Sequence, residues 1–238
     1  MLKQYKPTLD KLTKIVGKSH VLIDEQDTRH YRQGIRFGEG KVLAVVCPGT
    51  LLEQWQALQT IIEADCVVIM QAANTGLTGG STPYGDEYDR PVIIMSTRRL
   101  QGIQVILDGK QVVCLPGATL DNLERTLKPY NREPHSVIGS SCIGASVLGG
   151  VCNNSGGALV RRGPAYTEMA LYARVNESGE LELINHLGID LGNTAEEILT
   201  RLQKQDYETG QVTTQTTQLA SDNRYAHDVK QVDADSPA

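Results

Sequence analysis

The hydrophobic and polar positions of the chain follow two different spacings, one typical of helices and one typical of strands. A first helix is predicted over residues 7–16, with Pro7 in its first turn and Gly17 directly after its end. Its apolar positions share one face: Leu9, Leu12, Ile15 and Val16. Residues 24–40 are polar and charged and are expected to form a surface turn.

A strand, a helix and a second strand are predicted next. The apolar run Val42–Val46 is the first strand. Thr50 and Glu53 have the spacing of a capping box, and the helix that they open is expected to end at about Ala64. Val67–Met70 is the second strand. This order is a βαβ unit, which predicts a parallel pair joined by a right-handed crossover.

The remaining pattern predicts strands and helices in mixed order. A third strand is expected at Val92–Met95, and Asp108-Gly109 is a hairpin signal between two apolar runs. The other predicted elements are strands at 103–107, 112–115, 167–175 and 181–184, and helices at 120–128, capped by Thr119, at 144–151, and from the capping box at Thr194 to 203.

The segment Gln71–Ser81 follows the second strand and holds three glycines without a charged residue. Glycine lets the backbone approach a ligand closely, and successive N–H groups in such a turn can form a concave anion site. Ligands of open α/β sheets bind at the carboxyl ends of strands, where this segment lies. The residues alone leave two readings open: a loop that holds the diphosphate of a dinucleotide, and an ordinary glycine-rich connection.

A second glycine-rich region spans residues 139–157 and contains six glycines among small side chains. One or two glycines are explained by tight packing, but six favour backbone that lies against a flat ligand. Arg98 and Arg99 follow the third strand, and the sequence leaves open whether they lie near a phosphate or are simply exposed to solvent.

Composition excludes several classes of protein. The formal net charge is −5, which does not favour nucleic-acid binding or electrostatic attachment to anionic lipid. No apolar run approaches ~20 residues, so no membrane span is expected. The five cysteines lack paired spacing, which indicates reduced thiols in a cytoplasmic protein and no zinc site.

Three stretches together carry a resemblance to a known family. Gln71–Ser81, Arg132–Ser146 and the region from Asn153 to Glu168 resemble the FAD domain of bacterial quinone-dependent D-lactate dehydrogenases, which are flavoproteins of the vanillyl-alcohol-oxidase type. The resemblance extends from about Leu9 to Pro237 and weakens between residues 205 and 223.

The resemblance implies a non-covalently bound FAD. Backbone N–H groups near the start of the first loop would cover its diphosphate, and two further residues would finish that loop. Others would lie along the second half of the cofactor or approach the flavin. In chain order, the implied cofactor-binding residues are Ala72, Ala73, Asn74, Thr75, Gly76, Gly80, Ser81, Gly139, Ser146 and Gly156. For His135, a structural role, a flavin contact and a covalent link to FAD remain open.

The implied reaction is oxidation of D-lactate to pyruvate, with hydride transfer to the flavin and electrons passed to a membrane quinone. The family continues beyond the point where this sequence stops at Ala238, and the catalytic base and membrane-docking region are expected in that continuation. No catalytic residue is therefore assigned. The full-length enzymes are expected to be peripheral on the cytoplasmic face of the inner membrane.

The expected fold class is α+β: an FAD-binding PCMH-type domain with a small βαβ-containing subdomain and a second, mixed or antiparallel subdomain, incomplete at its C-terminus. Residues 1–40 are a helical lead-in, 41–204 the FAD-binding domain, divided into 41–117 and 118–204, and 205–238 a poorly structured tail. Three functions remain as hypotheses: the FAD-binding portion of the dehydrogenase, a truncated FAD-binding module without its own activity, and a domain in which the glycine-rich loops are only turns.

Overall fold

A four-stranded sheet forms the N-terminal half of the molecule in the computed structural model, which describes residues 3–134, 140–155, 165, 167 and 169–209. Its order is β1-β2-β4-β3, where the strands are β1 (Val21–Leu22), β2 (Ala44–Val46), β3 (Val67–Gln71) and β4 (Val92–Ser96). β2, β4 and β3 run parallel, and β1 is antiparallel to β2.

The expected pairing of the βαβ unit needs one correction. Its two strands do run parallel, but β4 lies between them, with Met95 opposite Val46 on one side and opposite Met70 on the other. The crossover helix α3 (Leu51–Glu63) therefore spans one strand position. Local sequence cannot reveal this insertion because β4 comes later in the chain.

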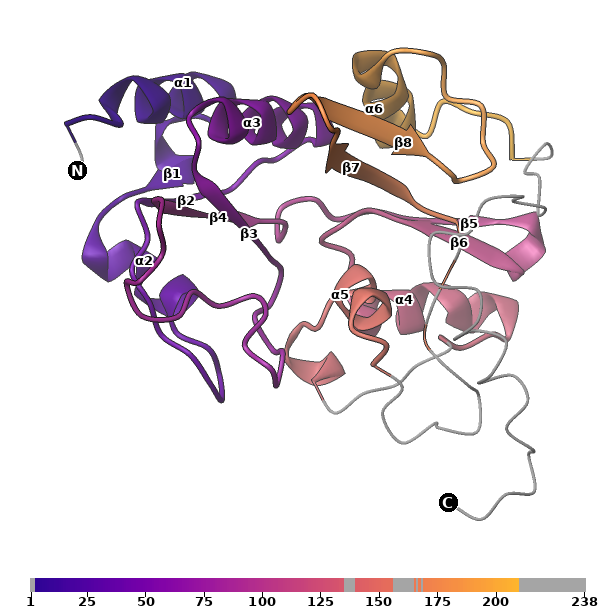
Figure 1. Ribbon diagram of the computed structural model, residues 1–238. Coiled ribbons are helices and arrows are strands. Elements are labelled where there is room, and N and C mark those ends of the chain that lie inside the picture. Colours follow the sequence, from indigo (N-terminus) through magenta and orange to yellow (C-terminus); the bar gives the residue numbers. More distant parts are fainter. Residues whose placement is uncertain (1–2, 135–139, 156–164, 166, 168, 210–238) are drawn as a thin grey trace.

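Helices cover both faces of this sheet (Figure 1). α1 (Lys6–Val16) and α3 pack on one face, and α2 (Glu25–Arg32) lies on the other. All five residues of β4 are buried as a result, which explains its continuous apolar run. α2 contradicts the expected surface turn at 24–40. Only Thr28 of this helix is buried, so it has no apolar stripe from which the sequence could predict it.

Two antiparallel hairpins and three helices form the rest of the described fold (Figure 1). The hairpins are β5 (Ile103–Ile106) with β6 (Gln111–Cys114), and β7 (Leu171–Val175) with β8 (Leu181–Asn185). The helices are α4 (Leu120–Leu127), α5 (Val147–Cys152) and α6 (Ala195–Lys204). A shared apolar cluster joins α3, β6, β8 and α6 through Leu51, Val113, Leu183 and Leu199.

Threonine caps open three of the helices, as the sequence predicts. Thr50, Thr119 and Thr194 each accept a hydrogen bond from the N–H three residues later, at 3.1, 3.2 and 3.2 Å. At α3 the side chain of Glu53 also reaches back, but its Oε2 accepts from Gly49 N, one residue before the cap, at 2.6 Å. These caps fix where the three helices begin.

Replacing Thr50 by alanine is expected to lower the free energy of unfolding by about 1 kcal/mol, because the N–H of Glu53 loses its acceptor. Urea unfolding followed by circular dichroism measures the change. Thr126→Ala is the matched control: its hydroxyl donates to Asn122 O within α4, and an exposed change there should stay within about 0.5 kcal/mol. Equal losses in the two variants would contradict a capping role.

Candidate functional site

The loop of residues 72–81 leaves the carboxyl end of β3, where the sequence placed it. The carboxyl ends of the parallel strands β2, β4 and β3 meet at one edge of the sheet. Cys47–Gly49 follows β2 at this edge, and Thr97–Arg99 follows β4. Thr97 N donates to Gln71 O at 2.8 Å, which ties the segment after β4 to the start of the loop.

Two amide side chains hold the shape of this loop. The Nε2 of Gln71 donates to Tyr31 O at 2.9 Å and to Ser81 O at 2.6 Å. Asn74 adopts a left-handed backbone conformation with φ of 57°. Its Nδ2 donates to Gln33 O at 2.9 Å, and its Oδ1 accepts from the hydroxyls of Ser81 at 2.9 Å and Thr82 at 2.8 Å. The loop is therefore closed on itself and fastened to the end of α2.

The backbone N–H groups of the loop have no partner within the described part of the chain. None of the N–H groups of residues 72–81 donates a hydrogen bond to another described residue; the first that does is Thr82 N, to Gly79 O at 3.0 Å. An unbroken run of available donors on a loop of fixed shape is what a diphosphate requires. The backbone thus offers the chemistry that the sequence predicted for residues 72–76.

The space beside two loop glycines is open. A Cβ added at Gly76 would meet only Ser81 Oγ, at 3.9 Å, and among the described residues a Cβ at Gly80 would meet nothing within 4 Å. Other glycines are required by packing: a Cβ at Gly117 would lie 2.1 Å from Thr97 O, and one at Gly34 would lie 2.0 Å from Phe37 O. Packing against the described residues therefore does not require glycine at positions 76 and 80, which leaves their backbone open to close approach by a ligand.

The second glycine-rich region meets the first at one described contact. A Cβ on Gly144 would lie 3.8 Å from the Cβ of Ala73, so the two backbones pass close together. Ser146 N-caps α5, and its buried hydroxyl accepts from Gly149 N at 3.0 Å. This hydroxyl therefore has a structural role, and its contact with a cofactor stays a prediction. α5 begins at Val147, three residues later than expected.

Some of the predicted site residues are exposed in the structure, and others are partly or fully buried. Gly76 and Gly80 are exposed, Ala72, Ala73, Thr75 and Ser81 are half-buried, and Asn74 is 8% exposed. The side chains of Asn74 and Ser81 bond each other, so both support the shape of the loop. Gly139, Gly156 and His135 lie outside the described residues.

Gln71, Gln33 and Thr82 belong to the loop's support, and the sequence analysis missed all three. The sequence signal that could have identified Gln71 is the position of a glutamine at the end of an apolar strand. In the structure Gln71 is 2% exposed, and a buried amide needs hydrogen-bond partners. Arg99 Nη1 donates to Cys47 O at 2.6 Å, so this arginine braces the sheet edge. Arg98 is exposed, which is the commoner of the two alternatives.

Tyr31 and Cys47 form a partly buried pair beside this edge, with the phenolic oxygen 3.8 Å from the sulfur. Burial, followed by the adjacent Cys47, raises the pKa of Tyr31 to about 12. Burial also raises the pKa of the Cys47 thiol, although Tyr31 and Arg99 act against it. Both groups are neutral at pH 7, so the pair favours packing over nucleophilic chemistry.

Stability is expected to fall between about pH 10 and pH 12, partly because of Tyr31. Its folded-state pKa lies above the unfolded value of about 10, so the folded state holds the proton more tightly. The resulting stabilisation is complete below about pH 10 and is lost as the pH rises toward 12. Tyr31→Phe should make the decline measured by urea unfolding less steep. An unchanged slope would contradict this assignment, and Tyr84→Phe, at an exposed tyrosine, is the control.

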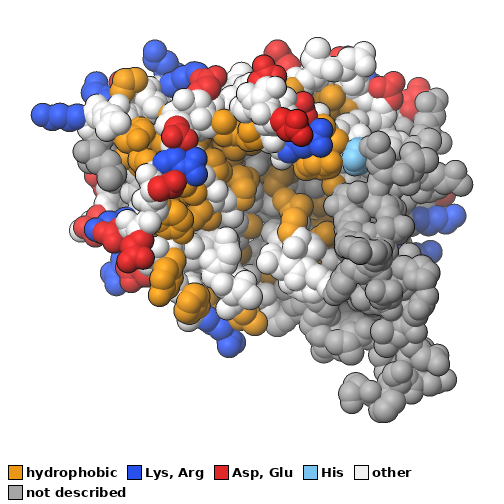
Figure 2. Space-filling view, in the orientation of Figure 1, with side chains coloured by type: hydrophobic (Ala, Val, Ile, Leu, Met, Phe, Trp, Pro, Cys, Tyr) orange, Lys and Arg blue, Asp and Glu red, His pale blue; other side chains and the backbone are white. Residues whose placement is uncertain are grey.

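Acidic and basic side chains alternate on the face shown in Figure 2. Ion pairs among the described residues include Lys11 with Glu63, which joins α1 to α3, Lys41 with Asp86, and Arg90 with Asp65. Among the described residues, no group of three or more histidine, cysteine or acidic side chains could hold a metal ion. Affinity for an anion at the glycine-rich loop would therefore depend mainly on backbone N–H groups.

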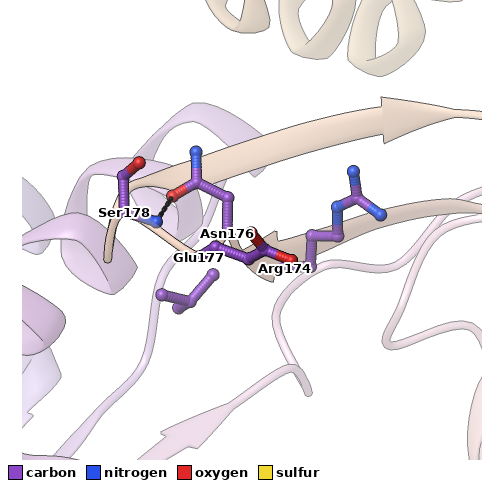
Figure 3. A pocket seen from close by; sticks show the side chains of 5 residues that line it. Arg174, Asn176, Glu177 and Ser178 are labelled. Carbon is purple, nitrogen blue, oxygen red and sulfur yellow. Dashed lines mark hydrogen bonds between the residues drawn. The ribbon is translucent and has the colours of Figure 1, made fainter.

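A hollow of about 440 Å³ lies at the turn of the β7–β8 hairpin (Figure 3). Two of its polar side chains are engaged with their neighbours: Asn176 Oδ1 accepts from Ser178 N at 3.0 Å, and Arg174 pairs with Glu182 at 3.0 Å. The geometry is that of a polar turn.

Comparisons with known proteins agree with the geometry of that loop. The model of a family described as "FAD binding domain" matches residues 42–182. The "Quinone-dependent D-lactate dehydrogenase" of Haemophilus influenzae is 60% identical over 97% of this chain, and that of Escherichia coli is 56% identical over 98%. In each case the chain spans 41% of the relative's length.

Solved structures share the fold at low sequence identity. Alkyldihydroxyacetonephosphate synthase matches with a TM-score of 0.65 and 15% identity, covering 79% of this chain and 37% of that one. p-Cresol methylhydroxylase with substrate bound matches with a TM-score of 0.59 and 16% identity, covering 76% and 35%. The expected α+β, FAD-binding PCMH-type fold is thereby confirmed.

None of the helices in the described ranges is both long and apolar enough to cross a membrane. The stretch matched by the family model makes up more than half of the chain and includes the loop after β3, the β5–β6 hairpin and α5. This chain belongs to the FAD binding domain family.

Proposed function

We propose that this chain is the FAD-binding portion of a flavoprotein oxidoreductase that converts D-lactate to pyruvate and passes electrons to a membrane quinone. The loop of residues 72–81 is the observation that carries the first half of this proposal. Its N–H groups have no partner in the described chain, and open space lies beside Gly76 and Gly80. These residues fit a dinucleotide's diphosphate.

The residues of the site divide into those that bind and those that support. N–H groups of Ala72, Ala73, Asn74, Thr75 and Gly76 hold the diphosphate, and Gly80 and Ser81 finish the loop. Ser146, and with it Gly139 and Gly156, lies along the rest of the cofactor. On this proposal FAD is held non-covalently, and neutral N–H donors and bare backbone make up the described part of its site.

The reaction is proposed from the relatives, because proteins 56 and 60% identical to this chain carry the name of a quinone-dependent D-lactate dehydrogenase. Bound FAD supplies two-electron redox chemistry. The role of the described residues is to bind and orient this group. No catalytic base is assigned to them, and substrate recognition, quinone reduction and membrane association are proposed for the longer protein.

A truncated FAD-binding module without activity of its own is the second candidate. The observation that favours it is coverage: the chain spans 41% of the relatives that give the reaction its name. On either proposal, we place the FAD-binding domain at residues 41–204, divided near residue 117. Residues 1–40 lead into this domain, and 205–238 follow it.

Visible absorption of the purified chain, with and without added FAD, tests the proposal. Flavin bands that survive desalting are expected. Loss of these bands on subsequent addition of D-lactate would support the dehydrogenase and would mean that this chain reduces its flavin without the rest of the longer protein. Retained flavin that D-lactate does not bleach is expected on both proposals, and bleaching in the longer protein then separates them. A chain that unfolds cooperatively yet retains no flavin would overturn both.

A further inference from the structure

Gln71 and Asn74 occupy an unusual position, because they are buried amides at a loop whose backbone N–H groups have no partner among the described residues. Their side chains are here called the amide clamp. Gln71 is 2% exposed and Asn74 is 8% exposed. A primary amide has two N–H donors, and both donors of Gln71 are used, toward Tyr31 O and Ser81 O. The Gln71 side chain therefore has no donor left for a ligand.

The amide clamp joins three segments that are distant in sequence. Gln71 lies directly before the loop, and its Nε2 donates to the carbonyl oxygen of Ser81, the last residue of the loop, at 2.6 Å. Asn74 links the loop's interior to Thr82 through Oδ1, at 2.8 Å, and to Gln33 through Nδ2, at 2.9 Å. Both ends and the interior of the loop are therefore fixed in an arrangement in which none of its own N–H groups pairs with a described carbonyl.

We propose that Gln71 and Asn74 are positioning residues for the cofactor's diphosphate, acting through the backbone of residues 72–81. This inference rests on the proposed FAD-binding function. It assigns the end of α2, through the carbonyls of Tyr31 and Gln33, to the support of the binding loop. It also explains why a polar residue ends the otherwise apolar strand β3.

Removal of the clamp is expected to weaken binding without unfolding the chain. Gln71→Leu removes two donated hydrogen bonds and should raise the Kd of FAD at least about tenfold, and that of ADP by a similar factor, because both ligands carry the diphosphate. Asn74→Gly retains the left-handed backbone but loses the side-chain bonds, and should act in the same direction. Gln101→Leu is the matched control, since its amide donates to Arg98 O outside the loop.

A conservative pair separates positioning from general packing. Thr82→Val keeps the shape of the side chain but removes the hydroxyl that donates a hydrogen bond to Asn74 Oδ1. Thr82→Ser keeps this hydroxyl and removes a methyl group. If the clamp positions the loop, the valine variant binds FAD more weakly and the serine variant is close to the unmodified chain. Saturating FAD should slow the amide hydrogen exchange of residues 72–81, relative to the FAD-free state, in the unmodified chain. The slowing should be smaller in Gln71→Leu.

The failures of the two proposals can be told apart. If the unmodified chain binds neither FAD nor ADP, the proposed function fails, and limited proteolysis of the ligand-free variants then tests the clamp alone. Faster cleavage within 72–82 in Gln71→Leu and Asn74→Gly supports it. Unchanged cleavage, or unchanged Kd values where the unmodified chain does bind, overturns it.

Discussion

Gly76→Val is expected to abolish FAD binding, raising the Kd at least about 100-fold, while the chain keeps its fold. The isopropyl group would occupy the open space beside the loop, where a ligand would otherwise contact backbone. Forcing such overlap costs about 3 kcal/mol or more, which corresponds to this loss of affinity. The protein itself tolerates the change, because a Cβ at this position lies 3.9 Å from its nearest described neighbour, Ser81 Oγ.

Flavin retention after desalting and a fluorescence titration with FAD measure the loss, and thermal unfolding establishes that the variant is folded. Gly179→Asn is the control: this glycine lies in the β7–β8 turn with a φ of 81°, which asparagine accepts better than most residues. Retained flavin in Gly76→Val would remove the diphosphate assignment from this loop. Loss of flavin in both variants would point to a general effect of altered turns.

Ile93→Ala is expected to lower the free energy of unfolding by about 3–4 kcal/mol. Ile93 is fully buried in β4, opposite Ala44 of β2 and Val68 of β3. Deleting three carbons there removes apolar contacts and leaves a cavity in the centre of the sheet. Such a loss is a large fraction of the stability of a typical domain.

Urea unfolding measures this loss, with Met70→Ala as the comparison on the neighbouring strand. Met70 is 43% exposed at the sheet's edge, so its truncation should cost less than about 1 kcal/mol. Similar losses in the two variants would contradict the central position of β4. A lower stability should also weaken FAD binding, because β4 fixes the spacing of the edge from which the loop departs.

The sequence predicts what is locally encoded. Thr50, Thr119 and Thr194 mark helix starts because the cap and the N–H that it accepts are three residues apart. The place of the glycine-rich loop was predictable in the same way, since it follows an apolar strand. Its role in binding a diphosphate stays a prediction, for which glycines and small side chains along the loop are the local signal.

Features that depend on distant segments could not be predicted. α2 is held by contacts to the sheet rather than by an apolar stripe, so its polar sequence indicated a turn. The insertion of β4 between β2 and β3 depends on residues that lie beyond the βαβ unit. The partners of Gln71 are carbonyls 40 and 10 residues away along the chain, and no local pattern identifies them.

The strand order of the sheet has a consequence for synthesis of the chain. Neither β2 nor β3 has its parallel neighbour until Ser96 has been made, because β4 is the neighbour of both. At about 5–20 residues per second, the ribosome needs about 3–10 seconds to advance from the end of β2 to the end of β4. Throughout that interval β2 lacks its parallel neighbour, and from the synthesis of Gln71 onward β3 lacks it too, so both apolar strands depend on chaperones or on rapid synthesis to keep them from other chains.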